Sequence, residues 1–202
     1  MEFLFAHWLE LIGVASGLIC VWLLARENVL TFPVGLGYSL VTVYVVAQAN
    51  LYADVLLNLY YVVMNAYGWF YWLRGAQAQR LAGRLVPQNL DRALAISLVV
   101  IILVGSVLMG LMFDRFSQAD FAFADSFTTV ASFVAMWMTA RKYLASWIAW
   151  FVIDVVQIVV YLLKGAQDPG LYLYAGLYTV YLAMAVMGWR SWRLSQQQAQ
   201  LA

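Results

Sequence analysis

The chain has 202 residues, of which 65% are hydrophobic and 10% are charged, and its mean hydropathy is +0.81. Charged residues make up about a quarter of a typical soluble domain, so this composition indicates an integral membrane protein. At about 20 residues for each membrane-spanning helix, the length allows about six to eight helices and no separate soluble domain. The formal net charge is +1 and no basic run is present, so nothing indicates binding to nucleic acid.

Seven apolar segments, separated by turn or charge signals, are long enough to cross a bilayer as helices. They are Trp8–Ala25, Leu30–Gln48, Leu51–Leu73, Ala93–Phe113, Phe123–Ala140, Leu144–Leu163 and Leu171–Trp189. The segments lack the alternating pattern of outer-membrane strands, so membrane-spanning strands are not expected. The first segment is not preceded by a basic region and is not followed by a small-residue cleavage site. We therefore expect a retained helix rather than a signal peptide.

The positive charges predict an orientation. If the N-terminus lies outside, the cytoplasmic side holds nine of the 11 Lys and Arg residues, and only Arg115 and Lys164 lie outside. Cytoplasmic loops of membrane proteins carry an excess of these residues. The sequence therefore predicts an N-terminus outside and a C-terminus in the cytoplasm.

The two ends of the chain are similar in sequence. A shift of 120 residues aligns the third segment with the seventh at eight identical residues, including the G-W-x-x-W of Gly68–Trp72 and Gly188–Trp192. A shift of 115 residues aligns Ala25-Arg26 with Ala140-Arg141. These identities indicate an internal duplication.

The duplication predicts two three-helix repeats joined by one linking helix, a 3+1+3 arrangement. The expected division is residues 1–73, then 74–122 with the cytoplasmic loop and the linking helix, then 123–202 with the cytoplasmic tail. A single linking helix gives both repeats the same orientation in the membrane, and parallel repeats of this kind hold substrates near the midplane between them.

The sixth segment carries a carboxylate, Asp154, near the middle of a membrane span. A charge at this depth costs about 2.5 to 3.5 kcal/mol on insertion scales, so it is expected to face the protein interior and to have a partner. Spacings of three and four place four further residues on its helical face, and these are Trp147, Trp150, Gln157 and Tyr161. The partner of Asp154 is either a ligand or a buried arginine, Arg26 or Arg141.

Other segments supply further candidate substrate-binding residues. They are Asn58, Asn65 and Trp69 in the third segment, Asp125 in the fifth and Tyr178 in the seventh. Membrane amides often bond only to a neighbouring helix, and an acidic residue near a helix N-terminus often only complements the helix dipole. Trp8, Trp189 and Trp192 are expected to be interfacial anchors. Aromatic rings with one carboxylate and several amides suit a flat, cationic or polar organic ligand.

The sequence disfavours two other functions. A retinal-binding receptor needs a lysine in the middle of a helix, and Lys142 and Lys164 lie at helix ends. An intramembrane enzyme using Asp125 and Asp154 lacks a recognisable nucleophile and base, and His7 is the sole histidine. We therefore expect neither a metal nor a cofactor, and no enzymatic activity.

Three motifs resemble the PnuC family of vitamin transporters. They are LYADVLLNLYYVVMNAYGWFYWLRG at residues 51–75, ADSFTTVASFVAMWMTARKY at residues 124–143, and the W-x-x-W that precedes Asp154. The resemblance covers nearly the whole chain. It implies a duplicated three-helix fold similar to that of the sugar-transporting SWEET proteins.

The resemblance also implies a function. Members of this family carry nicotinamide riboside across the bacterial inner membrane by facilitated diffusion, a uniport by alternating access, and a separate cytoplasmic kinase traps the substrate for NAD biosynthesis. Relatives of similar fold carry thiamine or riboflavin, and proton coupling through Asp154 remains an alternative. The family often has asparagine at the position of Asp154 and can have glutamine at that of Asn58. A homo-oligomer is left open.

Overall fold

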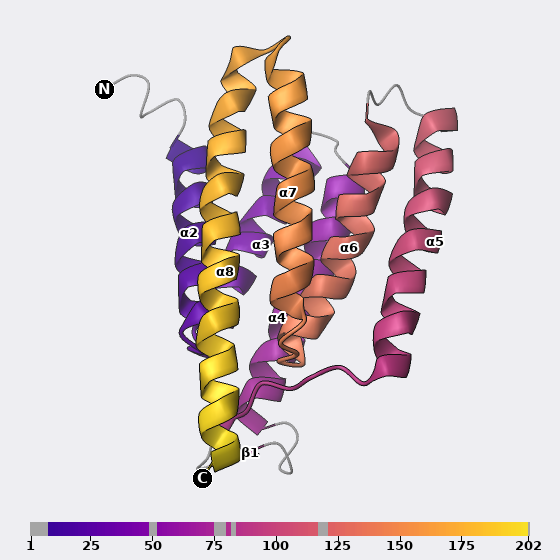
Figure 1. Ribbon diagram of the computed structural model, residues 1–202. Coiled ribbons are helices and arrows are strands. Elements are labelled where there is room, and N and C mark those ends of the chain that lie inside the picture. Colours follow the sequence, from indigo (N-terminus) through magenta and orange to yellow (C-terminus); the bar gives the residue numbers. More distant parts are fainter. Residues whose placement is uncertain (1–7, 49–51, 75–79, 82–83, 117–120, 202) are drawn as a thin grey trace. The chain divides into compact units, whose positions relative to one another are not determined.

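The computed structural model describes residues 8–48, 52–74, 80–81, 84–116 and 121–201, which form seven α-helices (Figure 1). The helices are α2 Trp8–Ala25, α3 Thr31–Gln48, α4 Tyr52–Arg74, α5 Arg92–Phe116, α6 Ala122–Ala140, α7 Ser146–Gly165 and α8 Tyr172–Leu201. The prediction of seven helices is confirmed. Leu51, the first residue of the third predicted segment, lies outside the described residues.

The helix bounds follow the predicted segments closely, with one large difference at the C-terminus. Helix α8 continues 12 residues beyond Trp189, to Leu201, through a sequence rich in glutamine. Hydropathy marks only the part of a helix that suits the bilayer, whereas glutamine, arginine and alanine propagate a helix well in water. A polar helical tail therefore extends past the apolar segment.

Four helices in the described part of the chain are long and apolar enough to cross a membrane by themselves. They lie within Thr31–Gln48, Arg92–Arg115, Ser146–Gly165 and Pro169–Leu201, and Ile12–Ala25 is a shorter apolar helix. The remaining two, α4 and α6, carry many of the amide, hydroxyl and carboxyl groups singled out from the sequence. The chain is therefore a multi-pass membrane protein in which polar groups are concentrated on particular helices.

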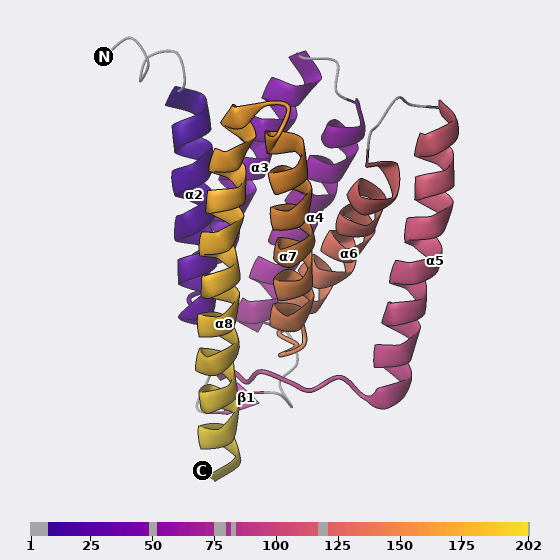
Figure 2. The ribbon, with the colours of Figure 1, turned by 45° about the horizontal axis from the view of Figure 1, so that its top comes forward.

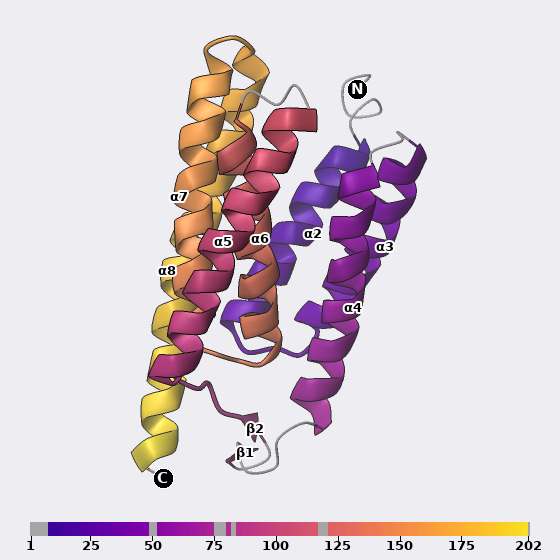
Figure 3. The ribbon, with the colours of Figure 1, turned by 90° about the vertical axis from the view of Figure 1, so that its right-hand side faces the viewer.

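The chain forms two compact units, Met1–Leu85 and Val86–Ala202. In the first unit α3 packs along α4 and against α2 (Figure 3). In the second unit α6 packs between α5 and α7, and α7 pairs with α8 (Figure 2). The three-part division at residues 73 and 122 stays a prediction.

The connection after α4 contains two short strands that the sequence analysis did not predict. Strands β1 Arg80–Leu81 and β2 Arg84–Leu85 pair antiparallel, with Arg80 opposite Leu85. With two residues each, the strands form a small hairpin in a loop and do not alter the helical architecture.

The turns after α2 and after α6 have the same geometry, 115 residues apart. Glu27 (φ 55°) and Lys142 (φ 61°) are the non-glycine residues with positive φ in the described chain. Each N–H donates to the carbonyl three residues earlier, at 2.9 Å for Glu27 to Leu24 and 3.0 Å for Lys142 to Thr139. The following N–H bonds five residues back in both turns, which completes a Schellman motif. Glycine usually occupies this left-handed position because a side chain there costs about 1 to 2 kcal/mol.

A matching aromatic contact follows each of these turns. In the first unit Phe32 of α3 fills the space beside Gly68 of α4 and meets the Trp72 ring edge to face, with centroids 5.0 Å apart. In the second unit, where Gly188 lies on α8, Trp147 and Trp192 make the equivalent contact with centroids 5.4 Å apart. A Cβ at either glycine would overlap the aromatic ring. Both glycines are therefore required for close helix packing.

The segment that leads into α5 is held by two other parts of the second unit. The Gln88 backbone N–H donates to the Lys142 carbonyl at 3.0 Å, and the Gln88 carbonyl accepts from the Leu144 N–H at 2.8 Å. The Gln196 side-chain amide donates to the Pro87 carbonyl at 2.9 Å. These bonds fix the start of α5 relative to the α6–α7 turn and the tail of α8.

Candidate functional site

Asp154 is a buried carboxylate in the middle of α7. Its side chain is 5% exposed, and among the described residues no hydrogen bond or ion pair reaches it. Among the described residues of the same unit, Arg141 forms no ion pair with Asp154, and the alternative pairing with Arg26 stays a prediction. An intramembrane carboxylate without a protein partner is costly, so this position is the strongest candidate for ligand contact.

Trp150 lies one turn before Asp154 on α7, and its indole already makes contacts within the protein. Its indole N–H donates to the Thr139 hydroxyl on α6 at 3.0 Å. Its ring packs against a core cluster of Ala131, Ala135 and Ile153. The ring is half-buried, so one hydrogen bond fixes its orientation while part of its surface stays accessible.

Gln157 lies one turn beyond Asp154 and is also half-buried. No hydrogen bond to its amide is found among the described residues. An amide supplies both donors and an acceptor, which makes it suited to orient a polar ring substituent. Asp154 and Gln157 therefore present two unsatisfied polar groups on one face of α7.

Trp147 shares this face in the helical pattern but packs toward α8. Its side chain is 2% exposed and fills the space beside Gly188. Its partner Trp192 is fully buried, so the expectation that Trp192 is an interfacial anchor is wrong. Trp192 is buried because Trp147, which fills the space beside Gly188, meets its ring edge to face with centroids 5.4 Å apart. Trp147 connects α7 to α8 at the base of the candidate site.

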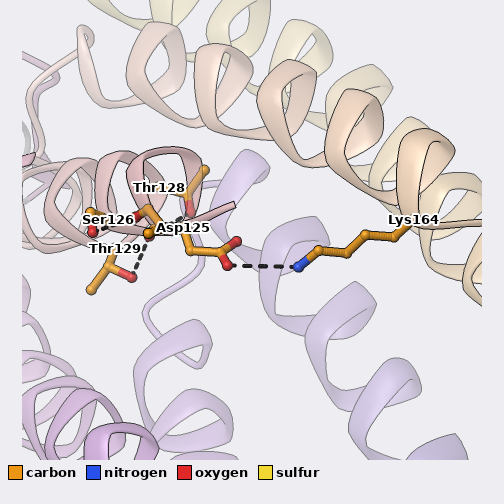
Figure 4. A network of polar contacts seen from close by, with 6 residues as sticks. Asp125, Ser126, Thr128, Thr129 and Lys164 are labelled. Carbon is orange, nitrogen blue, oxygen red and sulfur yellow. Dashed lines mark hydrogen bonds and ion pairs between the residues drawn. The ribbon is translucent and has the colours of Figure 1, made fainter. Parts of the chain in front are cut away.

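Asp125 lies in the first turn of α6 and forms an ion pair with the last turn of α7. Its carboxylate is 3.6 Å from the Lys164 ammonium (Figure 4). The Asp125 backbone carbonyl accepts hydrogen bonds from the Thr128 and Thr129 hydroxyls at 3.0 and 2.8 Å. The sequence predicted that Asp125 either complements the dipole of its own helix or contacts a ligand. It did not predict the ion pair with Lys164, because a contact between two different helices leaves no periodic pattern in the sequence.

Tyr161 and Tyr178 belong to a stack of tyrosines between α7 and α8. The Tyr161 ring stacks with the rings of Tyr174 and Tyr178, at centroid distances of 5.4 and 5.5 Å and with planes inclined by 20° and 21°. Tyr181 meets Tyr178 edge to face at 6.0 Å. The two predicted tyrosines are thus brought together, and Tyr174 is a member that the sequence analysis missed.

The predicted residues of the first unit lie on α4. Asn58 and Asn65 are buried, whereas Trp69 is 38% exposed. The Asn65 amide donates to the Tyr61 carbonyl at 2.8 Å, and its oxygen lies where a side chain at Gly35 of α3 would be. Asn65 therefore packs into a gap left by a glycine. No cluster of three or more metal-ligating side chains occurs in the residues that the structure describes.

The apolar helices, together with the polar groups that α4, α6 and α7 each carry, define a multi-pass membrane protein. Comparison with known proteins identifies the family. Residues 7–194 match the family model described as nicotinamide mononucleotide transporter. The chain therefore belongs to this family of bacterial vitamin transporters.

Curated relatives and a solved structure agree with this assignment. The nicotinamide riboside transporter PnuC of Escherichia coli (strain K12) is 27% identical, covering 92% of this chain and 84% of the relative. The riboflavin/roseoflavin transporter RibM of Streptomyces davaonensis is 25% identical, covering 95% and 87%. A crystal structure of the vitamin B3 transporter PnuC superposes with a TM-score of 0.73 over 96% of this chain and 83% of that one, at 21% identity. The relatives are transporters, and the fold is that of a vitamin transporter.

Proposed function

We propose that this protein carries nicotinamide riboside across the bacterial inner membrane as a uniporter. The observation that carries the proposal is the buried Asp154 carboxylate, which has no partner among the described residues. Nicotinamide riboside has a flat pyridinium ring with a fixed positive charge. A carboxylate and the accessible part of an aromatic ring match that chemistry, because both attract a delocalised cation.

In the proposed site the second unit recognises the ring. Asp154 faces the pyridinium charge, Trp150 offers a ring for stacking, and Gln157 bonds to the carboxamide or the ribose. Asn58, Asn65 and Trp69 of the first unit are proposed as further contacts. Tyr161, Tyr178 and Asp125 of the second unit are proposed to contact the substrate apart from Asp154, as it passes along α7. Trp147 acts through packing and positions α7.

The transport mechanism is alternating access, with 3+1+3 organisation of the helices. Helices α2–α4 and α6–α8 form the two repeats, and α5 is the linking helix. The paired turns at Glu27 and Lys142 and the paired aromatic contacts at Gly68 and Gly188 support this organisation. The N-terminus lies outside, the C-terminus is cytoplasmic, and a cytoplasmic kinase traps the substrate. A homo-oligomer is compatible with this arrangement.

A binding titration tests the proposed substrate. Purified protein in detergent is titrated with nicotinamide riboside, thiamine and riboflavin, and nicotinamide riboside is expected to bind most tightly. Trp150→Ala should weaken its binding by about 1 to 3 kcal/mol if the indole stacks on the ligand. An unchanged affinity would limit Trp150 to packing.

A riboflavin or thiamine transporter is the second candidate. The similarity to RibM favours riboflavin, and the carboxylate of Asp154 suits thiamine, which is also a cation with polar rings. Riboflavin is neutral, so its affinity should be insensitive to Asp154→Asn. Tightest binding of riboflavin with no effect of that variant would replace the first proposal.

Proton coupling is tested in proteoliposomes. A uniporter equilibrates nicotinamide riboside without responding to an imposed pH gradient. Uptake that follows the gradient in the wild type, and no longer does so in Asp154→Asn, would establish coupling through this carboxylate and contradict plain uniport.

A further inference from the structure

The ion pair between Asp125 and Lys164 is weakly held. The two charged atoms are 3.6 Å apart, beyond the usual range of an N–H to O hydrogen bond, and the side chains are 39% and 30% exposed. Pairs of this kind contribute little to stability, because water competes for both charges. The pair can therefore open without disrupting the fold.

Each charge is also stabilised without the other. Asp125 lies in the first turn of α6, where a helix dipole favours a negative charge. Lys164 lies in the last turn of α7, where the dipole favours a positive charge, and its ammonium is 5.3 Å from the centroid of the Phe121 ring. An incoming cation can consequently replace Lys164 beside Asp125 and leave neither residue in an unfavourable position.

The tyrosine stack begins one turn from this ion pair. Tyr161 precedes Lys164 by three residues on α7, so the two side chains share a helical face. The Tyr161 ring is nearly parallel to the Tyr174 ring and to the Tyr178 ring, and Tyr174 is 42% exposed. Parallel rings offer the surface on which another flat ring stacks, and their faces attract a cation.

We propose that Asp125, Lys164 and the stacked tyrosines form an entry site for a flat cationic ring, separate from Asp154. Without a ligand, the Lys164 ammonium forms the ion pair with the Asp125 carboxylate. An arriving ligand displaces it, places its own positive charge beside Asp125, and stacks against the tyrosines. Residues 154, 157, 161 and 164 follow one face of α7, so the entry site leads along this helix to the buried carboxylate. The direction of passage, from outside inward, rests on the proposed function.

Two charge variants test the entry site in opposite directions. The probe is 1-methylnicotinamide, the pyridinium ring without the ribose, titrated by calorimetry against the purified full chain. Each variant is also titrated in the Asp154→Asn background, because the proposed site at Asp154 takes the same ring. Lys164→Met frees the carboxylate and should tighten binding about two- to fivefold, whereas Asp125→Asn should weaken it by a similar factor. Neutral nicotinamide, which has the same ring, should be affected by neither variant. The proposal would be overturned if both variants changed the affinity for the cation in the same direction, or if neither variant changed it.

A third position tests the contribution of stacking. Tyr161→Leu removes the central ring and should weaken binding of 1-methylnicotinamide, while Tyr161→Phe retains the ring and should bind as the wild type does. Thermal melting of each variant monitors the fold. If a properly folded Tyr161→Leu protein binds the probe as tightly as the wild type, the tyrosines are only packing groups and the entry site is refuted.

Transport measurements separate this proposal from the function on which it rests. Opposite shifts with 1-methylnicotinamide, together with no uptake of nicotinamide riboside, support the entry site and contradict the proposed substrate. Uptake of nicotinamide riboside with no opposite shifts supports the substrate and refutes the entry site.

Discussion

The two units repeat a framework but differ in the groups placed on it. Each has a Schellman turn closed by a non-glycine residue, Glu27 or Lys142, and each inserts an aromatic side chain beside a glycine of its last helix. The aromatic residue that follows the turn is Phe32 in the first unit and Trp147 in the second. In both units an aromatic ring therefore fills the space beside a glycine, although the two rings differ in size.

One turn further along, large and small residues are exchanged. The first unit has Gly35 on α3 and the buried amide Asn65 on α4, whereas the second has Trp150 on α7 and Ala185 on α8 at the corresponding positions. In the first unit the Asn65 amide occupies the space beside Gly35. In the second unit the Trp150 indole donates to Thr139 of α6 instead, and it lies on the same helix as Asp154.

The polar content also differs at equal depth. The residue that corresponds to Asp154 is Ser39, and both are buried. A serine hydroxyl can donate a hydrogen bond to a backbone carbonyl of its own helix, while an ionised carboxylate requires a partner. The comparison teaches that the two units share packing contacts at corresponding positions, while at this position only the second unit carries a carboxylate.

The largest expected effect is on stability, and it comes from removing the aromatic side chain that packs beside Gly188. Trp147→Ala should lower the free energy of unfolding by about 3 to 5 kcal/mol, because it empties a fully packed space between α7 and α8. Phe32→Ala is the matched variant in the first unit and should act in the same way. Melting of the detergent-purified proteins measures both. Retained stability with weakened ligand binding would make Trp147 a ligand contact after all.

Asp154→Asn should have the next largest effect, on binding rather than on folding. The loss of a charge-assisted contact should reduce the affinity for nicotinamide riboside by about 1.5 to 3 kcal/mol. Ser39→Ala, at the corresponding position, should leave the affinity nearly unchanged. Calorimetric titration of both variants checks the asymmetry, which fails if Ser39→Ala is the more damaging.

Overfilling the notch at Gly188 should destabilise the protein by about 1 to 3 kcal/mol, because a Cβ there overlaps Trp147. Gly176→Ala lies on the same helix with nothing within 4 Å of the added carbon and should be neutral or slightly stabilising. The difference in melting temperature between Gly188→Ala and Gly176→Ala isolates the contact. Equal temperatures would show that the notch relaxes.

The smallest effect is expected at the hydrogen bond that orients Trp150. Thr139→Val removes the acceptor of the indole N–H and should cost about 0.5 to 1.5 kcal/mol in stability. Ligand affinity should fall slightly as the ring loses its fixed orientation. Thr179→Val, whose hydroxyl bonds only to its own helix at Ala175 in the described contacts, serves as the control. Similar losses of affinity in both variants would remove any role for the Thr139 bond.

Much of this protein follows from the sequence alone. Apolar runs of bilayer length determine seven helices, and identities 115 and 120 residues apart predict a duplication, because both depend on patterns along one chain. The helical period also places Asp154, Trp150 and Gln157 on one face. The tertiary structure alone decides what each face meets: Trp147 meets Gly188, Trp192 is buried, Asp125 pairs with Lys164, and Asp154 has no partner among the described residues. Periodicity determines the direction of a side chain, whereas its partner depends on how neighbouring helices pack.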